Sequence, residues 1–167
     1  MVELRIRQGS DDDLPAVLAL FDEAVQWLVG RGLSGQWGER SFSSRPALRS
    51  IVQRTIGDSD VRIAEHEGAV VGVLAVGSSP PYVPGNPVPE LYVTLLMSSR
   101  RLQGNRIGAR LLELATAIAR EQGAGVMRVD CWADSPRLIG FYEGQGFSRE
   151  GLFDLRGWRG QILSKAL

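Results

Sequence analysis

The segment RRLQGNRIGARLL, residues 100–112, joins an apolar run to an amphipathic helix and contains two glycines and four arginines. Gly104 and Gly108 bracket the turn into the helix, where unpaired backbone amides and the helix dipole favour an anion. The segment lacks the Lys-Ser/Thr pair of a Walker loop and the three-glycine spacing of a dinucleotide-binding loop. Two interpretations remain: a phosphate or pyrophosphate cradle, or a helix start that needs glycine for its geometry, with arginines in water.

A second segment, VDCWADSPRLIGFYEGQGF at residues 129–147, combines a strand, a Ser-Pro helix start and a short helix that ends in Gly-x-Gly-Phe. Together the two segments resemble the GNAT superfamily of N-acetyltransferases. The family's pyrophosphate motif, Gln/Arg-x-x-Gly-x-Gly/Ala, aligns with Gln103, Arg106 and Gly108. Its later motif, Asn-x-x-Ala-x-x-x-Tyr-Glu-x-x-Gly-Phe, aligns with Ser135, Leu138, Tyr142, Glu143, Gly146 and Phe147. The resemblance covers about residues 91–153.

Two positions depart from these motifs. Arg106 replaces the first glycine of the pyrophosphate motif, which adds bulk where the backbone would meet phosphate and a charge that could compensate. Ser135 replaces the usual asparagine, so a side-chain contact to the pantetheine arm is in doubt at this position. Ser135 still suits the cap of a helix that continues with Pro136.

The resemblance implies acetyl-CoA as the cofactor, and as the acceptor a primary amine of a small molecule or peptide that attacks the thioester directly in a ternary complex. The fold it implies is α/β (α+β), with a mixed, mostly antiparallel sheet, a splayed parallel pair of strands and about four flanking helices. The splayed strands are expected at residues 91–97 and 125–131. The residues implied to bind the cofactor are Leu96, Met97, Ser98, Gln103, Gly104, Asn105, Arg106, Ile107, Gly108, Ser135 and Tyr142.

Three side chains are candidates for proton transfer. Tyr142 lies at the family's position for the acid that protonates the departing thiolate, and a phenol of pKa near ~10 can protonate a sulfur of pKa near ~8.5. Packing beside Phe141 is the alternative. Glu90 and Asp130 are candidate bases that would act through water, although either residue could equally be structural. Cys131 without a nearby histidine is poorly activated for a covalent route.

Aromatic residues outside the two motifs are candidates for binding the acceptor. Trp27 and Trp37 flank a glycine-rich break after the first helix, and Tyr82 lies in the proline-rich loop at residues 78–89. These side chains could line an acceptor pocket. Core packing is the alternative for Trp27, which lies near the apolar face of its helix, and packing within the loop is the alternative for Tyr82.

Hydrophobic periodicity predicts the elements that position these residues. The predicted order is β, α, α, β, β, β, α, β, α, β, β, and helices that join strands require crossovers, so the sheet should be mixed. The second helix should turn Leu48, Ile51 and Val52 to one face. The predicted ranges are strands at 2–7, 90–97, 125–132, 146–153 and 158–167, a hairpin at 61–77, and helices from 14 and at 45–56, 107–122 and 135–145.

Length and charge limit the class of protein. A chain of 167 residues suits one domain, residues 1–167, and 19 basic residues balance 19 acidic ones, which removes the main argument for nucleic-acid binding. One cysteine and one histidine provide neither an intramolecular disulfide nor a usual zinc site, so no metal is expected. Without a signal-peptide pattern or an apolar run that could span a bilayer, we expect a cytoplasmic protein that does not bind a membrane.

Two functions remain open at this point. The first is an acetyl-CoA-dependent N-acyltransferase, favoured by the tyrosine at position 142. The second is a non-catalytic acyl-CoA sensor or interaction module, which the departures at Arg106 and Ser135 keep open. A homodimer is also possible, because an edge strand near the C-terminus could pair with a second subunit.

Overall fold

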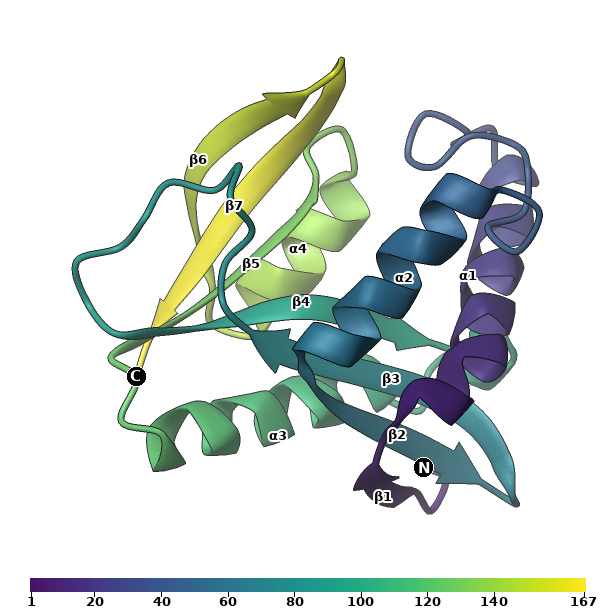
Figure 1. Ribbon diagram of the computed structural model, residues 1–167, viewed down its shortest axis with the longest axis horizontal. Coiled ribbons are helices and arrows are strands. Elements are labelled where there is room, and N and C mark those ends of the chain that lie inside the picture. Colours follow the sequence, from purple (N-terminus) through teal and green to yellow (C-terminus); the bar gives the residue numbers. More distant parts are fainter. The chain divides into compact units, whose positions relative to one another are not determined.

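The computed structural model describes residues 1–167, and its helices and strands follow the predicted order (Figure 1). The strands are β1 (Arg5–Gln8), β2 (Asp60–His66), β3 (Ala69–Gly77), β4 (Glu90–Ser98), β5 (Val126–Trp132), β6 (Ser148–Leu155) and β7 (Trp158–Ala166). The α-helices are α1 (Leu14–Val29), α2 (Pro46–Asp58), α3 (Ile107–Glu121) and α4 (Pro136–Gly144). Two short 3-10 turns, η1 (Asp11–Asp13) and η2 (Arg100–Leu102), precede α1 and α3. None of the helices is both long and apolar enough to cross a membrane.

The seven strands form a mixed sheet in the order β1-β2-β3-β4-β5-β7-β6. β4 and β5 pair in parallel, whereas the pairs β1–β2, β5–β7 and β6–β7 are antiparallel. The parallel ladder joins Glu90 to Val126, Leu91 to Met127 and Tyr92 to Arg128. This pair is parallel because α3 makes the crossover between its strands. The predicted mixed, mostly antiparallel sheet with one parallel pair is confirmed.

The chain forms two compact parts. The first part comprises residues 1–75 and 95–111, and the second part comprises residues 76–94 and 112–167. The single domain expected from the length stays a prediction.

Helices α1 and α2 cover one face of β2 and β3 in the first part (Figure 1). The inward stripe of α1 has the 3–4 spacing of an amphipathic helix. Its buried apolar side chains are Leu14, Val17, Leu18, Leu20, Phe21, Ala24, Val25 and Leu28. In α2 the buried positions are Val52 and Ile56, whereas Ile51 is 49% exposed. The prediction that Ile51 faces inward was wrong, because the stripe follows i, i+4 spacing from Leu48.

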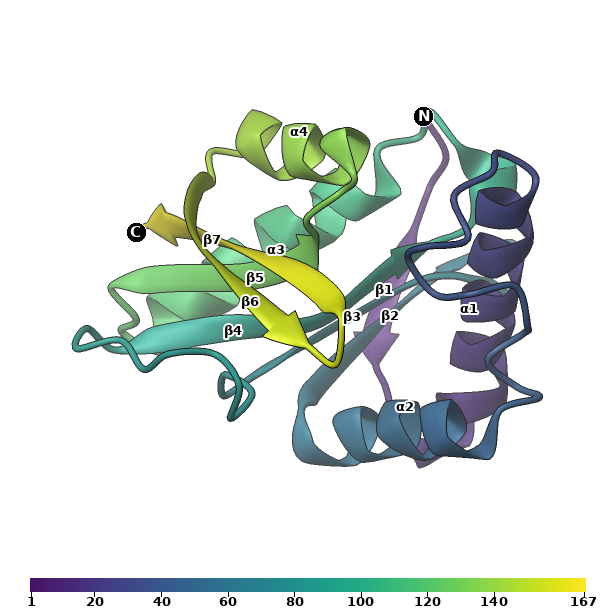
Figure 2. The ribbon, with the colours of Figure 1, turned by 90° about the horizontal axis from the view of Figure 1, so that it is seen from above.

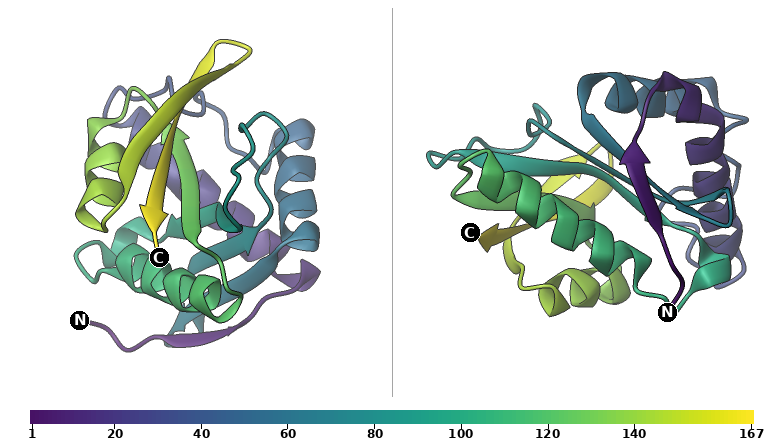
Figure 3. Two further views of the ribbon diagram at one scale, coloured as in Figure 1. Left: turned by 90° about the vertical axis from the view of Figure 1, so that its left-hand side faces the viewer. Right: turned by 90° about the horizontal axis from the view of Figure 1, so that it is seen from below.

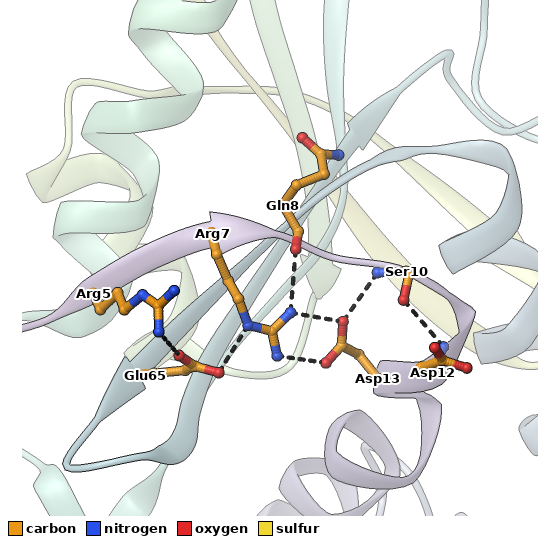
Figure 4. A network of polar contacts seen from close by, with 7 residues as sticks. All are labelled: Arg5, Arg7, Gln8, Ser10, Asp12, Asp13 and Glu65. Atoms are coloured by element: carbon orange, nitrogen blue, oxygen red, sulfur yellow. Dashed lines mark hydrogen bonds and ion pairs between the residues drawn. The ribbon is translucent and has the colours of Figure 1, made fainter.

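A polar network ties the start of α1 to β1 and β2 in the first part (Figure 4). The Asp13 carboxylate accepts the backbone N–H of Ser10, and the Ser10 hydroxyl accepts the N–H of Asp12, so Ser10 and Asp13 cap the turn η1 that leads into α1. The Arg7 guanidinium donates to Asp13 at 2.7 Å and to Glu65 at 2.8 Å. One side chain therefore joins the first strand, the first helix and the second strand.

The second part is organised around the antiparallel strands β5, β7 and β6, with α4 alongside (Figure 2). The β6–β7 hairpin turns at Arg156 and Gly157, both with positive φ, and is the long yellow hairpin of Figure 3. β6 is the last strand in the sheet order and exposes Leu152 and Leu155. Pairing of this edge with a second copy stays a prediction.

Candidate functional site

The loop between η2 and α3, in the first part, has an unusual backbone. Gly104 has φ of 90° and Arg106 has φ of 56°, both in the left-handed region. A Cβ at Gly104 would meet no atom within 4 Å, so glycine serves the backbone conformation there rather than a close approach. Arg106 adopts the conformation that favours glycine at a position where the family motif has glycine. This conformation costs an arginine about 1 kcal/mol.

The first turn of α3 offers backbone donors next to this loop. The first helical hydrogen bond runs from the N–H of Arg110 to the carbonyl of Arg106, at 2.9 Å. The amides of Ile107, Gly108 and the residue that follows therefore have no acceptor within the helix. Gln103 and Arg106 are exposed, and residues 103–108 contain no acidic side chain. The segment thus fits a pyrophosphate group, through amide donors, the helix dipole and nearby arginine charge.

The last residues of β4 were predicted to contact the cofactor. Met97 is buried in the core that α1 and α2 form with the sheet, and Leu96 and Ser98 are half-buried. Because the Met97 side chain is used in packing, its backbone is the group that can contact a ligand. Cofactor binding by Leu96, Met97 and Ser98 stays a prediction.

Tyr142 lies on α4 in the second part and is buried, with its ring in T-shaped contact with the rings of Phe141 and Phe147. Burial raises the pKa of the Tyr142 phenol far above its usual value, and the neighbouring Cys131 and Asp130 raise it further. The phenol therefore stays protonated at neutral pH, as an acid must before it reacts.

Ser135 begins α4 as its cap. Its hydroxyl accepts the backbone N–H of Leu138 at 3.2 Å, and Pro136 occupies the first turn. The predicted helix cap at Ser135 is confirmed. A contact of Ser135 with the cofactor stays a prediction.

Glu90 is held in an ion pair with a buried arginine. Arg128, 2% exposed, donates to Glu90 at 3.0 Å, to Glu150 at 2.9 Å and to the carbonyl of Pro84 at 2.9 Å. Burial alone would lower the pKa of Arg128, but its hydrogen bonds to the two glutamates raise it. Glu90 thus compensates a buried charge that would be costly to leave unpaired, which gives it a structural role.

Asp130 has different surroundings. Its Oδ2 atom lies 2.5 Å from the hydroxyl of Tyr92, a fully buried side chain on β4. Burial raises the pKa of Asp130 above the usual range, and the hydrogen bond from Tyr92 opposes this shift. Partial burial, with the nearby charge of Asp130, also raises the pKa of Tyr82 to about 12. The structure thus brings Asp130 together with two phenols.

Sequence reasoning did not include Tyr92 in the site. Tyr92 pairs with Arg128 across the parallel ladder, and Asp130 follows Arg128 by two residues. Side chains two apart share a face, so Tyr92 and Asp130 meet on one side of the sheet. The alternation within each strand was visible in the sequence, but the register between strands was not.

Burial raises the pKa of the Cys131 thiol to about 12. At neutral pH the side chain is therefore a thiol rather than a nucleophilic thiolate, which disfavours a covalent acyl-enzyme.

The three aromatic candidates for acceptor binding lie in different surroundings. The guanidinium groups of Arg31 and Arg100 lie 4.0 Å and 4.4 Å from the centre of the Trp27 ring. Trp37 packs on the rings of Phe21 and Phe42, at 5.3 Å and 5.4 Å between ring centres. Tyr82 is 41% exposed and lies 4.9 Å from the ring of Phe153. Their contacts with an acceptor stay predictions.

The sequence matches the model of the acetyltransferase (GNAT) family over residues 23–147, a range that includes both motif segments. No curated protein matches the sequence.

Solved structures of similar fold were also found. A ribosomal-protein-alanine N-acetyltransferase from Brucella melitensis is 25% identical, with a TM-score of 0.69 and coverage of 98% of this chain and 99% of that one. A GNAT-family acetyltransferase from Listeria monocytogenes is 21% identical, with a TM-score of 0.74 and coverage of 99% and 96%. PaiA N-acetyltransferase from Thermoplasma acidophilum, in complex with coenzyme A, is 20% identical, with a TM-score of 0.70 and coverage of 99% and 100%.

Proposed function

Because the chain belongs to the GNAT family of acetyltransferases, we propose that it transfers the acetyl group of acetyl-CoA to a primary amine of a small molecule or peptide. The observation that carries this proposal is the family match over residues 23–147, which includes Tyr142 and the loop at residues 103–108, called the glycine-arginine loop below. The similarity to an enzyme named for acetylating a ribosomal-protein alanine supports an amine of a peptide as one acceptor class. The amine attacks the thioester directly while both substrates are bound.

The pyrophosphate of acetyl-CoA binds at Gln103 to Gly108 in this proposal. The exposed loop and the free amides at the start of α3 support this placement. A backbone amide at Leu96 to Ser98 donates to the thioester carbonyl and stabilises the negative charge that develops there.

Asp130 is the base in this proposal, and Tyr142 is the acid. Glu90 is less suited as a base, because it already neutralises the buried Arg128. A carboxylate whose pKa is raised by burial accepts a proton more readily than an exposed one, which favours Asp130. Tyr142 then protonates the departing thiolate. Desolvation raises the pKa of a buried thiolate as it raises that of a phenol, so their proton affinities stay close enough for transfer.

A non-catalytic acyl-CoA-binding module is the second candidate. The left-handed backbone of Arg106, where the family motif has glycine, is the observation that favours it. Such a module would bind acetyl-CoA without turning it over. For either function the proposed compartment is the cytoplasm, because a single buried cysteine suits a reducing environment.

The test is to incubate the purified protein with acetyl-CoA and a panel of small amines and peptides. Release of free CoA thiol is followed together with the mass of each acceptor. Thiol release that depends on one class of amine, with one acetyl group added to it, supports the enzyme. Saturable binding of acetyl-CoA with no acetylated product across the panel would instead indicate the binding module.

A further inference from the structure

Glu23 on α1 contacts the turn η2 that leads into the glycine-arginine loop. One carboxylate oxygen of Glu23 accepts the hydroxyl of Ser99 at 3.0 Å, the backbone N–H of Arg101 at 3.3 Å and the backbone N–H of Arg100. The Glu23 side chain is 20% exposed. A single side chain thus gathers three donors from consecutive residues, 76 or more positions later in the chain.

The same turn is held from two other directions. The backbone N–H of Ser99 donates to the carbonyl of Val71 on β3 at 2.8 Å. Where the loop ends, the Asn105 side chain accepts the N–H of Val2 at 3.0 Å and donates to the carbonyl of Leu102 at 3.0 Å. Glu23 therefore fixes the entry of a short segment whose exit is fixed separately.

The Glu23 carboxylate could affect the loop in two ways, as a nearby negative charge or as a hydrogen-bond acceptor that holds the backbone. A negative charge near a pyrophosphate site repels the ligand, so a carboxylate that acted only through its charge would weaken binding. One carboxylate oxygen of Glu23, however, accepts the two backbone amides and the hydroxyl, and charge-assisted hydrogen bonds of this kind hold a backbone in one geometry. The other oxygen lies 3.8 Å from the guanidinium of Arg101, a largely exposed side chain. The two roles predict opposite signs for the effect of its removal.

We propose that Glu23 is a positioning residue that fixes η2 and so orients the loop at residues 103–108 for the pyrophosphate of acetyl-CoA. This inference rests on the proposed function, because it takes the loop to be the pyrophosphate site. The ring of Trp27, one turn further along α1, faces the guanidinium of Arg100 at 4.4 Å. The same helix therefore contacts both the backbone of the turn and one of its side chains.

The test compares binding of CoA with binding of pantetheine, which lacks the pyrophosphate and nucleotide. NMR titration suits the weak binding expected of pantetheine, and calorimetric titration suits CoA if it binds more tightly. The variants are Glu23→Ala, which removes the acceptor, and Glu23→Gln, which keeps one acceptor oxygen and loses the charge. The matched control is Asp22→Asn. Asp22 is the neighbouring carboxylate on α1 and accepts the N–H and hydroxyl of Ser43, at 3.1 Å and 2.5 Å, in a different loop.

Glu23→Ala should weaken CoA binding by about tenfold and leave pantetheine binding within about twofold. Glu23→Gln should show a smaller loss, and Asp22→Asn should bind both ligands as the wild type does.

Three results would overturn the inference. Unchanged or tighter CoA binding by Glu23→Ala and Glu23→Gln would mean that the carboxylate acts only as a nearby charge or not at all. Equal losses for CoA and pantetheine in both variants would mean general structural damage rather than pyrophosphate positioning. If the wild type itself binds CoA no better than pantetheine, the pyrophosphate site of the proposed function fails as well.

Discussion

Asp130 combines a half-buried carboxylate with a tyrosine donor, and burial has the larger effect on its pKa, which lies above the ordinary value of 3.8. The folded chain therefore holds this proton more tightly than the unfolded chain does. Stability from this group is complete below pH 3.8 and is lost as the pH rises through the folded-state pKa. At neutral pH the buried charge opposes folding.

Asp130→Asn should therefore raise the thermal midpoint at neutral and alkaline pH, by about 2–4 °C if the gain is about 1 kcal/mol. This gain in thermal midpoint should shrink as the pH falls toward 3.8, and thermal unfolding followed by circular dichroism at several pH values measures it.

The turnover of Asp130→Asn should fall by about a hundredfold through loss of the proposed base. In the control, Glu90→Gln, an acceptor for Arg128 remains, so turnover should stay within about threefold. A large loss of turnover in Glu90→Gln, with little loss in Asp130→Asn, would make Glu90 the base.

Tyr142→Phe keeps the packing of the ring on Phe141 and Phe147 and removes the hydroxyl that would donate the proton. Steady-state kinetics should show turnover reduced by about a hundredfold, with CoA affinity within about twofold of wild type. Turnover within about twofold of wild type would show that another group protonates the thiolate.

Arg106→Gly tests the departure in the loop motif. Glycine adopts the left-handed conformation without strain, so the thermal midpoint of the unliganded protein should not fall. The free energy of unfolding should rise by about 1 kcal/mol. Loss of the guanidinium should weaken CoA binding by about fivefold at low salt. Titration at low and high salt measures this effect. Unchanged affinity at both would mean that the charge of Arg106 does not contact the phosphates.

At the scale of elements, Gly72 permits the close packing of α3 on β3. A Cβ at this position would lie 2.9 Å from Ile107 and 3.1 Å from Leu111, on the first and second turns of the helix. Valine there must displace the start of α3, which carries the proposed pyrophosphate amides.

Gly72→Val should lower the free energy of unfolding by about 1–3 kcal/mol and also weaken CoA binding. Urea unfolding and NMR titration measure the two effects. Gly140→Ala is the control, because Gly140 is exposed on α4 and a Cβ there meets no atom within 4 Å. That control should be neutral or slightly stabilising. A Gly72→Val protein of wild-type stability would show that α3 can shift without cost.

At the scale of the whole molecule, a chain of 167 residues is expected to unfold as one domain. Thermal unfolding followed by near-ultraviolet and far-ultraviolet circular dichroism should give coincident single transitions. Two separate transitions would contradict the single domain and assign different stabilities to the two parts.

The local pattern of residues in the sequence was enough to predict much of the fold. The order of elements, the mixed sheet, the cap at Ser135 and the glycine-arginine loop before α3 could all be read from neighbouring residues, because periodicity and capping are short-range effects. The same spacing placed Ile51 wrongly, since it could not decide which of two overlapping stripes on α2 meets the core.

The tertiary structure decided which distant side chains meet. Tyr92 and Asp130 are 38 positions apart, and so are Glu90 and Arg128, while Glu23 reaches Ser99 across 76. Strand register and helix packing bring these partners together, and both depend on the whole core rather than on local sequence. Sequence alone thus identified the family's loop and tyrosine. Only the fold shows that Asp130 lies beside Tyr92, that Glu90 neutralises a buried arginine and that Glu23 contacts the turn before the loop.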